Sequence, residues 1–159
     1  MKHIGACPTC LRRSWLLSLV APYIEKAVSG ATSSIVPELL RLDNEDLVEA
    51  VAPSLGLTLL ARVEALPESS LYGDLRTADC WATCRHDSLY PEALREAPDA
   101  PWALIARGDK ALLSDFQSGD AVTIVGARRA TSYGREVART LAHDLAEAGF
   151  TIVSGLAFG

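Results

Sequence analysis

The sequence lacks the features by which membrane and secreted proteins are recognised. The apolar run at residues 15–21 is too short to cross a bilayer. The first residues, Met1-Lys2-His3-Ile4-Gly5-Ala6-Cys7, show no secretory signal. We therefore expect a cytoplasmic protein with no membrane partner, in which the four cysteines are reduced.

The sequence also lacks the motifs of several enzyme classes. It contains neither a Gly-x-Gly-x-x-Gly dinucleotide fingerprint nor the Gly-Lys-Ser/Thr of a phosphate loop. Ser154 is not in the Gly-x-Ser-x-Gly setting of a serine nucleophile. His86 and His143 have no visible catalytic partner in the sequence. The residues do not suggest a catalytic triad or a site with paired carboxylates. We expect a protein that is not an enzyme and has no cofactor.

An excess of positive charge is missing as well. The formal net charge is −5, which is unusual for a protein that binds nucleic acid. The charge is unevenly distributed, because residues 1–120 have a net charge of −6 and residues 121–159 have a net charge of +1. Any contact with a nucleic acid must therefore come from a local patch, for which the candidates are Arg128, Arg129 and Arg135.

What the sequence does contain is a strand–loop–helix–strand pattern in its last forty residues. Residues 121–125 and 150–153 are uncharged and rich in β-branched side chains. Between them, apolar residues recur at helical spacing over residues 133–148, and Gly149 follows where a left-handed cap is expected. The pattern predicts a βαβ unit whose strands lie in a parallel sheet and are buried on both faces.

The loop after the first of these strands is the candidate binding site. Ligands of doubly wound sheets bind at the carboxyl ends of the strands, where Gly126 and the Ser154-Gly155 turn both lie. Thr131 or Ser132 is expected to cap the following helix. The free amides of that helix start, together with Arg128 and Arg129, favour an anion. Tyr133 is expected either to pack against the helix start, which is the favoured interpretation, or to stack or hydrogen-bond near the ligand.

Two motifs in this region resemble a known family. Val125-Gly126-x-Arg128-x-x-x-x-Tyr133-Gly134, followed later by Ser154-Gly155-Leu156-Ala157-x-Gly159, is similar to the core of the DprA/Smf DNA-processing proteins. Upstream, Tyr90-Pro91-x-x-Leu94, Ala100-Pro101 and Arg107-Gly108 resemble the segment that precedes this core. The resemblance covers roughly residues 80–159.

The resemblance implies an extended Rossmann fold that binds single-stranded DNA and loads the recombinase RecA during natural transformation. The resemblance also implies that the full-length protein forms a homodimer. The expected DNA- and phosphate-binding residues are Gly126, Arg128, Arg129, Ser132, Tyr133, Gly134, Ser154 and Gly155.

The sequence departs from the family at its end. In the family the second motif continues into Ile-Asp and a later Ala-His, whereas this sequence stops at Gly159. We therefore expect a truncated product with an exposed apolar face and impaired DNA binding.

The alternative function is a nucleotide-phosphate-binding enzyme similar to the nucleoside monophosphate phosphoribohydrolases. Such an enzyme needs a glutamate base, and neither loop of residues 121–159 contains one.

The region before this core predicts a separate helical module. Helices are expected at residues 11–29, with a kink or break at Pro22, at 37–42, after an Asp43 cap, and at 55–66; residues 30–34 form a linker. Strands follow at residues 79–85 and 102–107. The sequence thus predicts an α/β protein. A small all-helical region, residues 1–78, precedes an incomplete Rossmann-like, three-layer parallel sheet domain, residues 79–159.

The cysteines form two close pairs, Cys7 with Cys10 and Cys80 with Cys84. If residues 80–84 form a strand, the Cα atoms of Cys80 and Cys84 lie roughly 13 Å apart. That is too far for both thiolates to bind one zinc, because each zinc–sulfur distance is about 2.3 Å. We therefore expect packing cysteines and no bound metal. The set that would escape this objection is Cys7, Cys10, Cys84 and His86.

Overall fold

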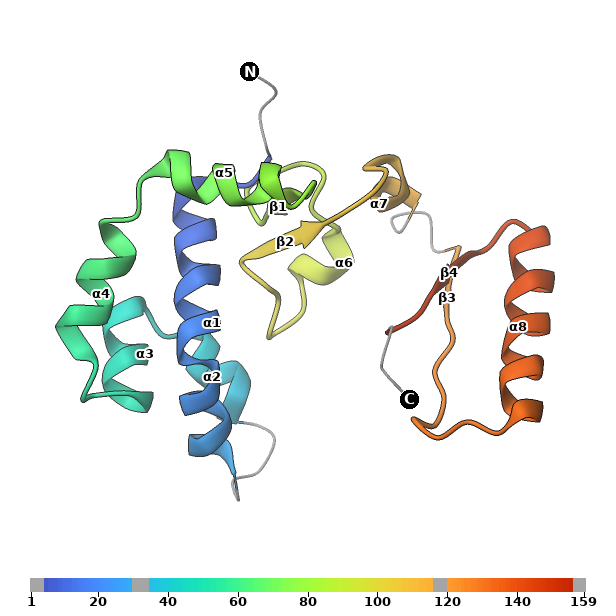
Figure 1. Ribbon diagram of the computed structural model, residues 1–159, viewed down its shortest axis with the longest axis horizontal. Helices are drawn as coiled ribbons and strands as arrows, with labels where there is room; N and C mark the ends of the chain where they lie inside the picture. The colour runs from blue at the N-terminus through green and yellow to red at the C-terminus, as the bar shows by residue number, and fades with distance from the viewer. Residues whose placement is uncertain (1–4, 30–34, 116–119, 156–159) are drawn as a thin grey trace. The chain divides into compact units, whose positions relative to one another are not determined.

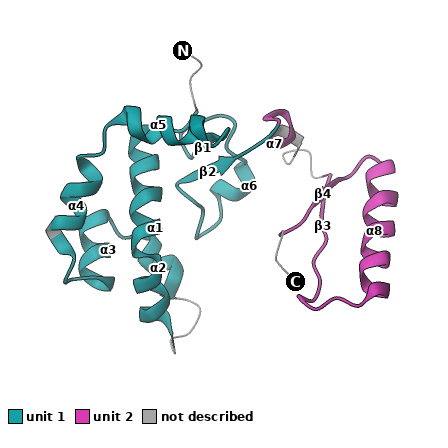
Figure 2. Ribbon diagram, viewed as in Figure 1, with its two compact units in different colours: residues 1–108 teal, residues 109–159 magenta. Residues whose placement is uncertain are grey.

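A computed structural model describes residues 5–29, 35–115 and 120–155 of the 159-residue chain (Figure 1). The chain divides into two compact units, residues 1–108 and 109–159 (Figure 2). The sequence pattern places the boundary earlier, between residues 78 and 79. The units differ from the predicted domains because the two strands after residue 78 pack with the helices that precede them.

Five helices open the first unit. They are α1 (Pro8–Val28), α2 (Ile35–Arg41), α3 (Asn44–Val51), α4 (Gly56–Glu64) and α5 (Glu68–Thr77). The first four confirm the predicted helices, and α1 continues through Pro22 as one helix. The predicted linker at 30–34 lies outside the described residues. Sequence reasoning missed α5, which begins after Pro67, because residues 67–70 have the composition of a loop.

The helices enclose an aliphatic core. Asp43 caps α3 as predicted, because its carboxylate accepts a hydrogen bond from the Asp46 N–H at 2.8 Å. α3 lies against α1 and α4 (Figure 1). The buried residues of this core are Leu16, Val20, Leu47, Val48 and Val63.

One buried cation joins α1 to the chain between α2 and α3. The Arg13 side chain is 3% exposed. Its guanidinium donates to Asn44 Oδ1 at 2.7 Å and to the carbonyl oxygens of Leu42 at 2.7 Å and Leu40 at 3.3 Å. Burial lowers the pKa of Arg13, and the nearby Asp43 carboxylate opposes that shift. These bonds compensate part of the desolvation cost of the charge.

Two strands complete the first unit. β1 (Trp81–Cys84) and β2 (Ala103–Ala106) confirm the predicted strands and pair antiparallel, with Thr83 opposite Leu104. They form their own two-stranded sheet, so they do not extend the predicted parallel sheet. The segment before α1 lies along β1, and the Ala6 N–H donates to the Ala82 carbonyl at 3.1 Å. The second buried cluster consists of Ala6, Cys10, Leu11, Leu75, Ala82 and Cys84.

The connection between β1 and β2 contains α6 (Glu92–Arg95) and is held by polar side chains. Tyr90 is 1% exposed, and its hydroxyl donates to the Pro101 carbonyl at 2.6 Å. Arg95 donates to the carbonyl oxygens of Arg85 and Tyr90. The Tyr90-Pro91-x-x-Leu94 motif therefore has a structural role, since its tyrosine fixes this connection to the start of β2.

The second unit contains α7 (Ala111–Asp115), β3 (Ala121–Thr123), α8 (Ser132–Glu147) and β4 (Thr151–Val153). β3 and β4 pair in parallel, with Val122 opposite Ile152, and α8 connects them. Gly149 has a φ of +92° between α8 and β4, which is the left-handed conformation expected there. The α/β class is confirmed, and the β3–α8–β4 arrangement is consistent with part of a Rossmann-like fold.

Burial in this unit differs from the prediction. Both outer residues of β3, Ala121 and Thr123, are exposed, and no residue of α8 is buried. Val137 and Leu141, on the apolar face of α8, are 45% and 48% exposed. The expectation that both strands are buried on two faces is wrong, because the described elements provide one helix to cover a two-stranded sheet.

Among the described residues, none of the helices has the length and hydropathy that a membrane span requires.

The Tyr90 hydroxyl offers a direct test of the first unit. Tyr90→Phe should lower the free energy of unfolding by about 1 kcal/mol, because the Pro101 carbonyl loses a buried donor. Tyr90→Ala should cost about 3–5 kcal/mol through the cavity it leaves. Urea unfolding followed by tryptophan fluorescence reports this unit, because Trp15, Trp81 and Trp102 all belong to it. Tyr23→Phe is the control, since Tyr23 is 36% exposed; an equal loss in both variants would contradict the assigned role.

Candidate functional site

The predicted DNA-binding residues lie at one end of the parallel strand pair. In the parallel register Thr123 lies opposite Val153, and the Ile124 N–H donates to the Val153 carbonyl at 2.9 Å. The chain therefore leaves β3 and β4 at the same end, as Figure 1 shows. We call this end the phosphate edge; it comprises Gly126, Arg128, Arg129, Ser132, Tyr133, Gly134, Ser154 and Gly155.

The start of α8 forms the centre of the phosphate edge. Thr131 is the N-cap residue, with φ −68° and ψ 162°, and its hydroxyl accepts from the Gly134 N–H at 3.1 Å. The structure thus selects Thr131 over Ser132 as the cap. The N–H groups of Ser132 and Tyr133 have no acceptor within the helix, as in any first turn. These groups favour the binding of an anion at the helix N-terminus.

Unpaired positive charge directly precedes this helix start in the chain. Arg128 and Arg129 are exposed, and neither makes a hydrogen bond or ion pair with the described residues. The first turn of α8 contains no acidic residue, whereas Asp144 and Glu147 lie near its other end. This distribution reinforces the positive potential of the helix N-terminus instead of neutralising it. The arrangement therefore favours an anion at the phosphate edge.

Tyr133 and the glycines keep the phosphate edge open. Tyr133 is 77% exposed, so the prediction that it packs against the helix start is wrong, and its ring is available for stacking. Gly126 and Gly155 do not have a positive φ, and a Cβ atom at either would meet no atom of the described residues within 4 Å. Their backbone conformations do not require glycine. The missing side chains instead leave the backbone accessible to a ligand.

A second group of functional side chains lies in the first unit. Cys7, Cys10, Cys84 and His86 form a cluster in which the sulfur and ring nitrogen atoms lie within 4.8 Å of one another. Cys7 Sγ and Cys10 Sγ lie 3.4 and 3.5 Å from His86 Nδ1. The long distance between Cys80 and Cys84 along a strand does not argue against this set, because Cys80 is not part of it. The predicted strand that contains Cys84 is confirmed as β1, and Cys84 is the residue that this strand contributes to the cluster.

The environments of the two buried cysteines in this cluster differ. Burial raises the pKa of the Cys10 thiol, and the neighbouring cysteines raise it further. Burial also raises the pKa of Cys84, but hydrogen bonds from the backbone N–H groups of Cys7 and His86 outweigh it, and the net shift is downward. The Cys7 N–H lies 3.4 Å from Cys84 Sγ. The backbone thus supplies hydrogen-bond donors that favour the thiolate form of Cys84.

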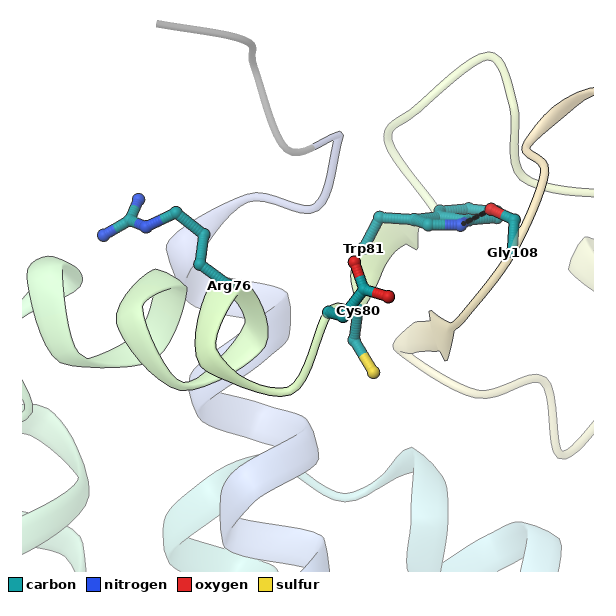
Figure 3. Close-up of a pocket in the computed structure, with 5 residues that line it drawn as sticks. Arg76, Cys80, Trp81 and Gly108 are labelled. Atoms are coloured by element: carbon teal, nitrogen blue, oxygen red, sulfur yellow. Dashed lines mark hydrogen bonds between the residues drawn. The ribbon is translucent and has the colours of Figure 1, made fainter.

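A hollow of about 380 Å³ lies at the start of β1, and Figure 3 shows its lining. The indole N–H of Trp81 donates to the Gly108 carbonyl at 2.9 Å. The guanidinium of Arg76 points away from Trp81 in this view. The residues that line the hollow, Arg76, Asp79, Cys80, Trp81 and Gly108, do not bring a set of catalytic groups together.

Known proteins match part of the chain. Residues 81–159 match the family model of the DNA recombination-mediator protein A. The DNA processing protein DprA of Bacillus subtilis (strain 168) is 43% identical over 70 residues, which are 44% of this chain and 23% of that protein. The Protein Smf of Escherichia coli (strain K12) is 34% identical over an alignment of 113 residues that covers 65% of this chain and 28% of that protein. No solved structure is significantly similar.

The Thr131 cap can be tested independently of any ligand. Thr131→Ala should destabilise α8 by about 1 kcal/mol, because the Gly134 N–H loses its acceptor. The loss should appear as faster amide hydrogen exchange in residues 132–147. Thr131→Ser keeps the hydroxyl and should exchange like the unsubstituted chain. Equal exchange in the alanine and serine variants would show that the hydroxyl does not hold the helix start.

Proposed function

Because residues 81–159 belong to the DprA/Smf family of DNA-processing proteins, we propose that this chain acts in DNA recombination and natural transformation by binding single-stranded DNA at the phosphate edge. The matched residues include every member of that edge. The chain spans 23% and 28% of the two relatives' lengths, so the proposal concerns the binding step that these residues contribute.

The observation that carries the proposal is the convergence of exposed positive charge and free amides at one strand end. Arg128 and Arg129 follow β3, and the capped start of α8 lies directly after them. An arginine guanidinium forms charge-assisted, often bidentate hydrogen bonds with phosphate. Backbone phosphates are therefore the part of DNA that this edge recognises best, and binding should depend little on base sequence.

Tyr133 adds a contact that favours a single strand. Its exposed ring belongs to the same first turn as the free amides of α8. Unpaired bases stack on aromatic side chains in proteins that bind single strands, whereas bases in a duplex are already stacked on one another. Ser154 and Gly155 follow β4 at the same end of the strand pair, and Gly155 adds no side chain there.

Two partners complete the proposal. We infer that the bound strand is transferred to the recombinase RecA, and that the protein acts as a homodimer. Both inferences come from the family resemblance. The exposed Val137 and Leu141 on α8 support protein association, because apolar side chains on a helix face are usually covered by another surface.

A nucleotide-hydrolysing enzyme is the alternative, and the composition of the site favours binding over catalysis. Residues 124–131 and 154–155 contain no acidic side chain, and Glu136 comes only after the first turn of α8. A general base must reach the water or hydroxyl that it deprotonates. We therefore propose that the phosphate edge holds a phosphate without cleaving the molecule that carries it.

Substitution of the loop arginines tests the binding proposal. Arg128→Ala should weaken binding of a fluorescent single-stranded oligonucleotide about tenfold, or ~1.4 kcal/mol, through loss of one charge-assisted contact. The slope of log affinity against log salt should fall by about 0.7 for each phosphate contact removed. Fluorescence anisotropy at several salt concentrations measures both quantities, and a thermal melt checks that the fold is retained.

The matched control is Arg62→Ala, which removes the same charge from an exposed position on α4 of the other unit. It should leave both affinity and slope nearly unchanged. Equal losses in the two variants would indicate a general charge effect, and binding that is indifferent to salt would contradict the electrostatic account. Release of free base from nucleoside monophosphates would instead support the enzymatic alternative.

A further inference from the structure

The cysteine–histidine cluster joins parts of the chain that are distant in sequence. Cys7 is the N-cap of α1, and Cys10 lies in the first turn of that helix. Cys84 ends β1, and His86 lies in the turn that follows. Three sulfurs and one imidazole nitrogen therefore meet although 77 residues separate Cys7 from Cys84.

The distances within the cluster agree with a tetrahedral zinc site. Zinc–sulfur bonds of about 2.3 Å and zinc–nitrogen bonds of about 2.0 Å place sulfur and nitrogen ligands about 3.5 Å apart at the tetrahedral angle. The two sulfur-to-Nδ1 distances are 3.4 and 3.5 Å. All four atoms lie within 4.8 Å of one another, so a metal at the centre would be within reach of each.

We propose that Cys7, Cys10, Cys84 and His86 bind one zinc ion. Three thiolates and an imidazole are ligands that favour zinc over magnesium or calcium, which prefer oxygen. Four protein ligands fill the tetrahedron and leave no position for water or substrate, so the ion has a structural role. All four ligands belong to the first unit, whereas the phosphate edge belongs to the second.

The surrounding backbone supports these ligands. Pro8 begins α1 directly after Cys7, and the helix turn brings Cys10 back beside it. The Cys7 N–H donates to Cys84 Sγ, an outer contact of the kind that orients metal ligands. Gly5 lies so close to the turn containing Asp87 that a side chain at Gly5 would clash with the Asp87 carboxylate. The segment before the first ligand is therefore packed against the turn that carries His86.

Simple packing explains this cluster less well. His86 is exposed, and yet the same ring nitrogen faces two sulfur atoms. The fourth cysteine, Cys80, lies apart from the cluster, where its thiol donates to the Ala78 carbonyl at 3.4 Å. Cys80 thus has a local partner, whereas Cys7, Cys10 and Cys84 lie close to His86. This grouping of three cysteines with one histidine is typical of a metal site.

Binding exchanges protons for the metal. Zinc replaces the thiol protons of three cysteines and accepts the lone pair of neutral His86, so up to three protons are released and no oxidation occurs. The ion then fastens the start of α1 to the end of β1. The buried residues at this junction include Ala6, Cys10 and Cys84, and they form a small core for which such a crosslink is valuable.

Zinc analysis of the whole chain tests the proposal. After purification with a reductant and incubation with zinc, the chain should retain one zinc ion per molecule through gel filtration. Cys80→Ser is the matched control and should retain one as well. His86→Ala should reduce zinc affinity at least tenfold in competition with a chromophoric chelator, and because His86 is exposed this variant should still fold. Cys7→Ser, Cys10→Ser and Cys84→Ser should show the same loss.

Cobalt and thermal measurements separate a lost ligand from a lost fold. Cobalt added to the unsubstituted chain and to Cys80→Ser should give the d–d and thiolate charge-transfer bands of a tetrahedral site, and these bands should change in His86→Ala. Zinc should raise the melting temperature of the first two proteins much more than that of His86→Ala. The proposal is overturned if the unsubstituted chain retains no zinc, if Cys80→Ser loses it equally, or if Cys7 and Cys10 form a disulfide under reducing conditions.

Discussion

The parallel pairing of β3 with β4 determines where this protein can bind a ligand. Parallel strands need a crossover, and α8 is that crossover, so the loop after β3, the helix start and the turn after β4 are all brought to one end. An antiparallel pair would have sent the two loops to opposite ends. Arg128 and Ser154 share an edge for this reason, and not because of any direct contact between them. The chemistry of the edge therefore depends on three backbone-paired positions in each strand.

The first unit relies on a different principle, in which long polar side chains hold irregular backbone in place. Arg13 fixes the connection between α2 and α3, and Arg95 fixes the connection between β1 and β2. Tyr90 does the same with a hydroxyl. Carbonyl groups that no helix or strand satisfies would be costly inside the unit, and these side chains supply their donors. Residues that resemble a functional motif, such as Tyr90-Pro91, can thus owe their identity to folding.

Local signals in the sequence are sufficient for most elements of the fold and for part of the phosphate edge. The Asp43 and Thr131 caps, the apolar spacing of α8 and the left-handed Gly149 each depend on neighbours a few residues away. Interactions between distant segments are not accessible in the same way. Nothing in the sequence near β1 indicates that it pairs with β2, and the meeting of Cys84 with Cys7 requires the fold. Packing is predicted for Tyr133 because an aromatic ring at a helix start is apolar enough to be buried. That prediction is wrong, because burial depends on which other segments cover the ring, and the ring is exposed.

The order in which the two halves of the first unit can form follows from where their contacts lie along the chain. The aliphatic core draws on side chains between Leu16 and Val63, so it can assemble as soon as those residues have left the ribosome. The N-terminal end of α1 must wait, because Cys7 meets Cys84 and His86 only after the chain has grown past them. A nascent chain therefore passes through a stage in which one end of α1 is packed and its cysteines are still exposed to whatever thiols or metal ions surround them.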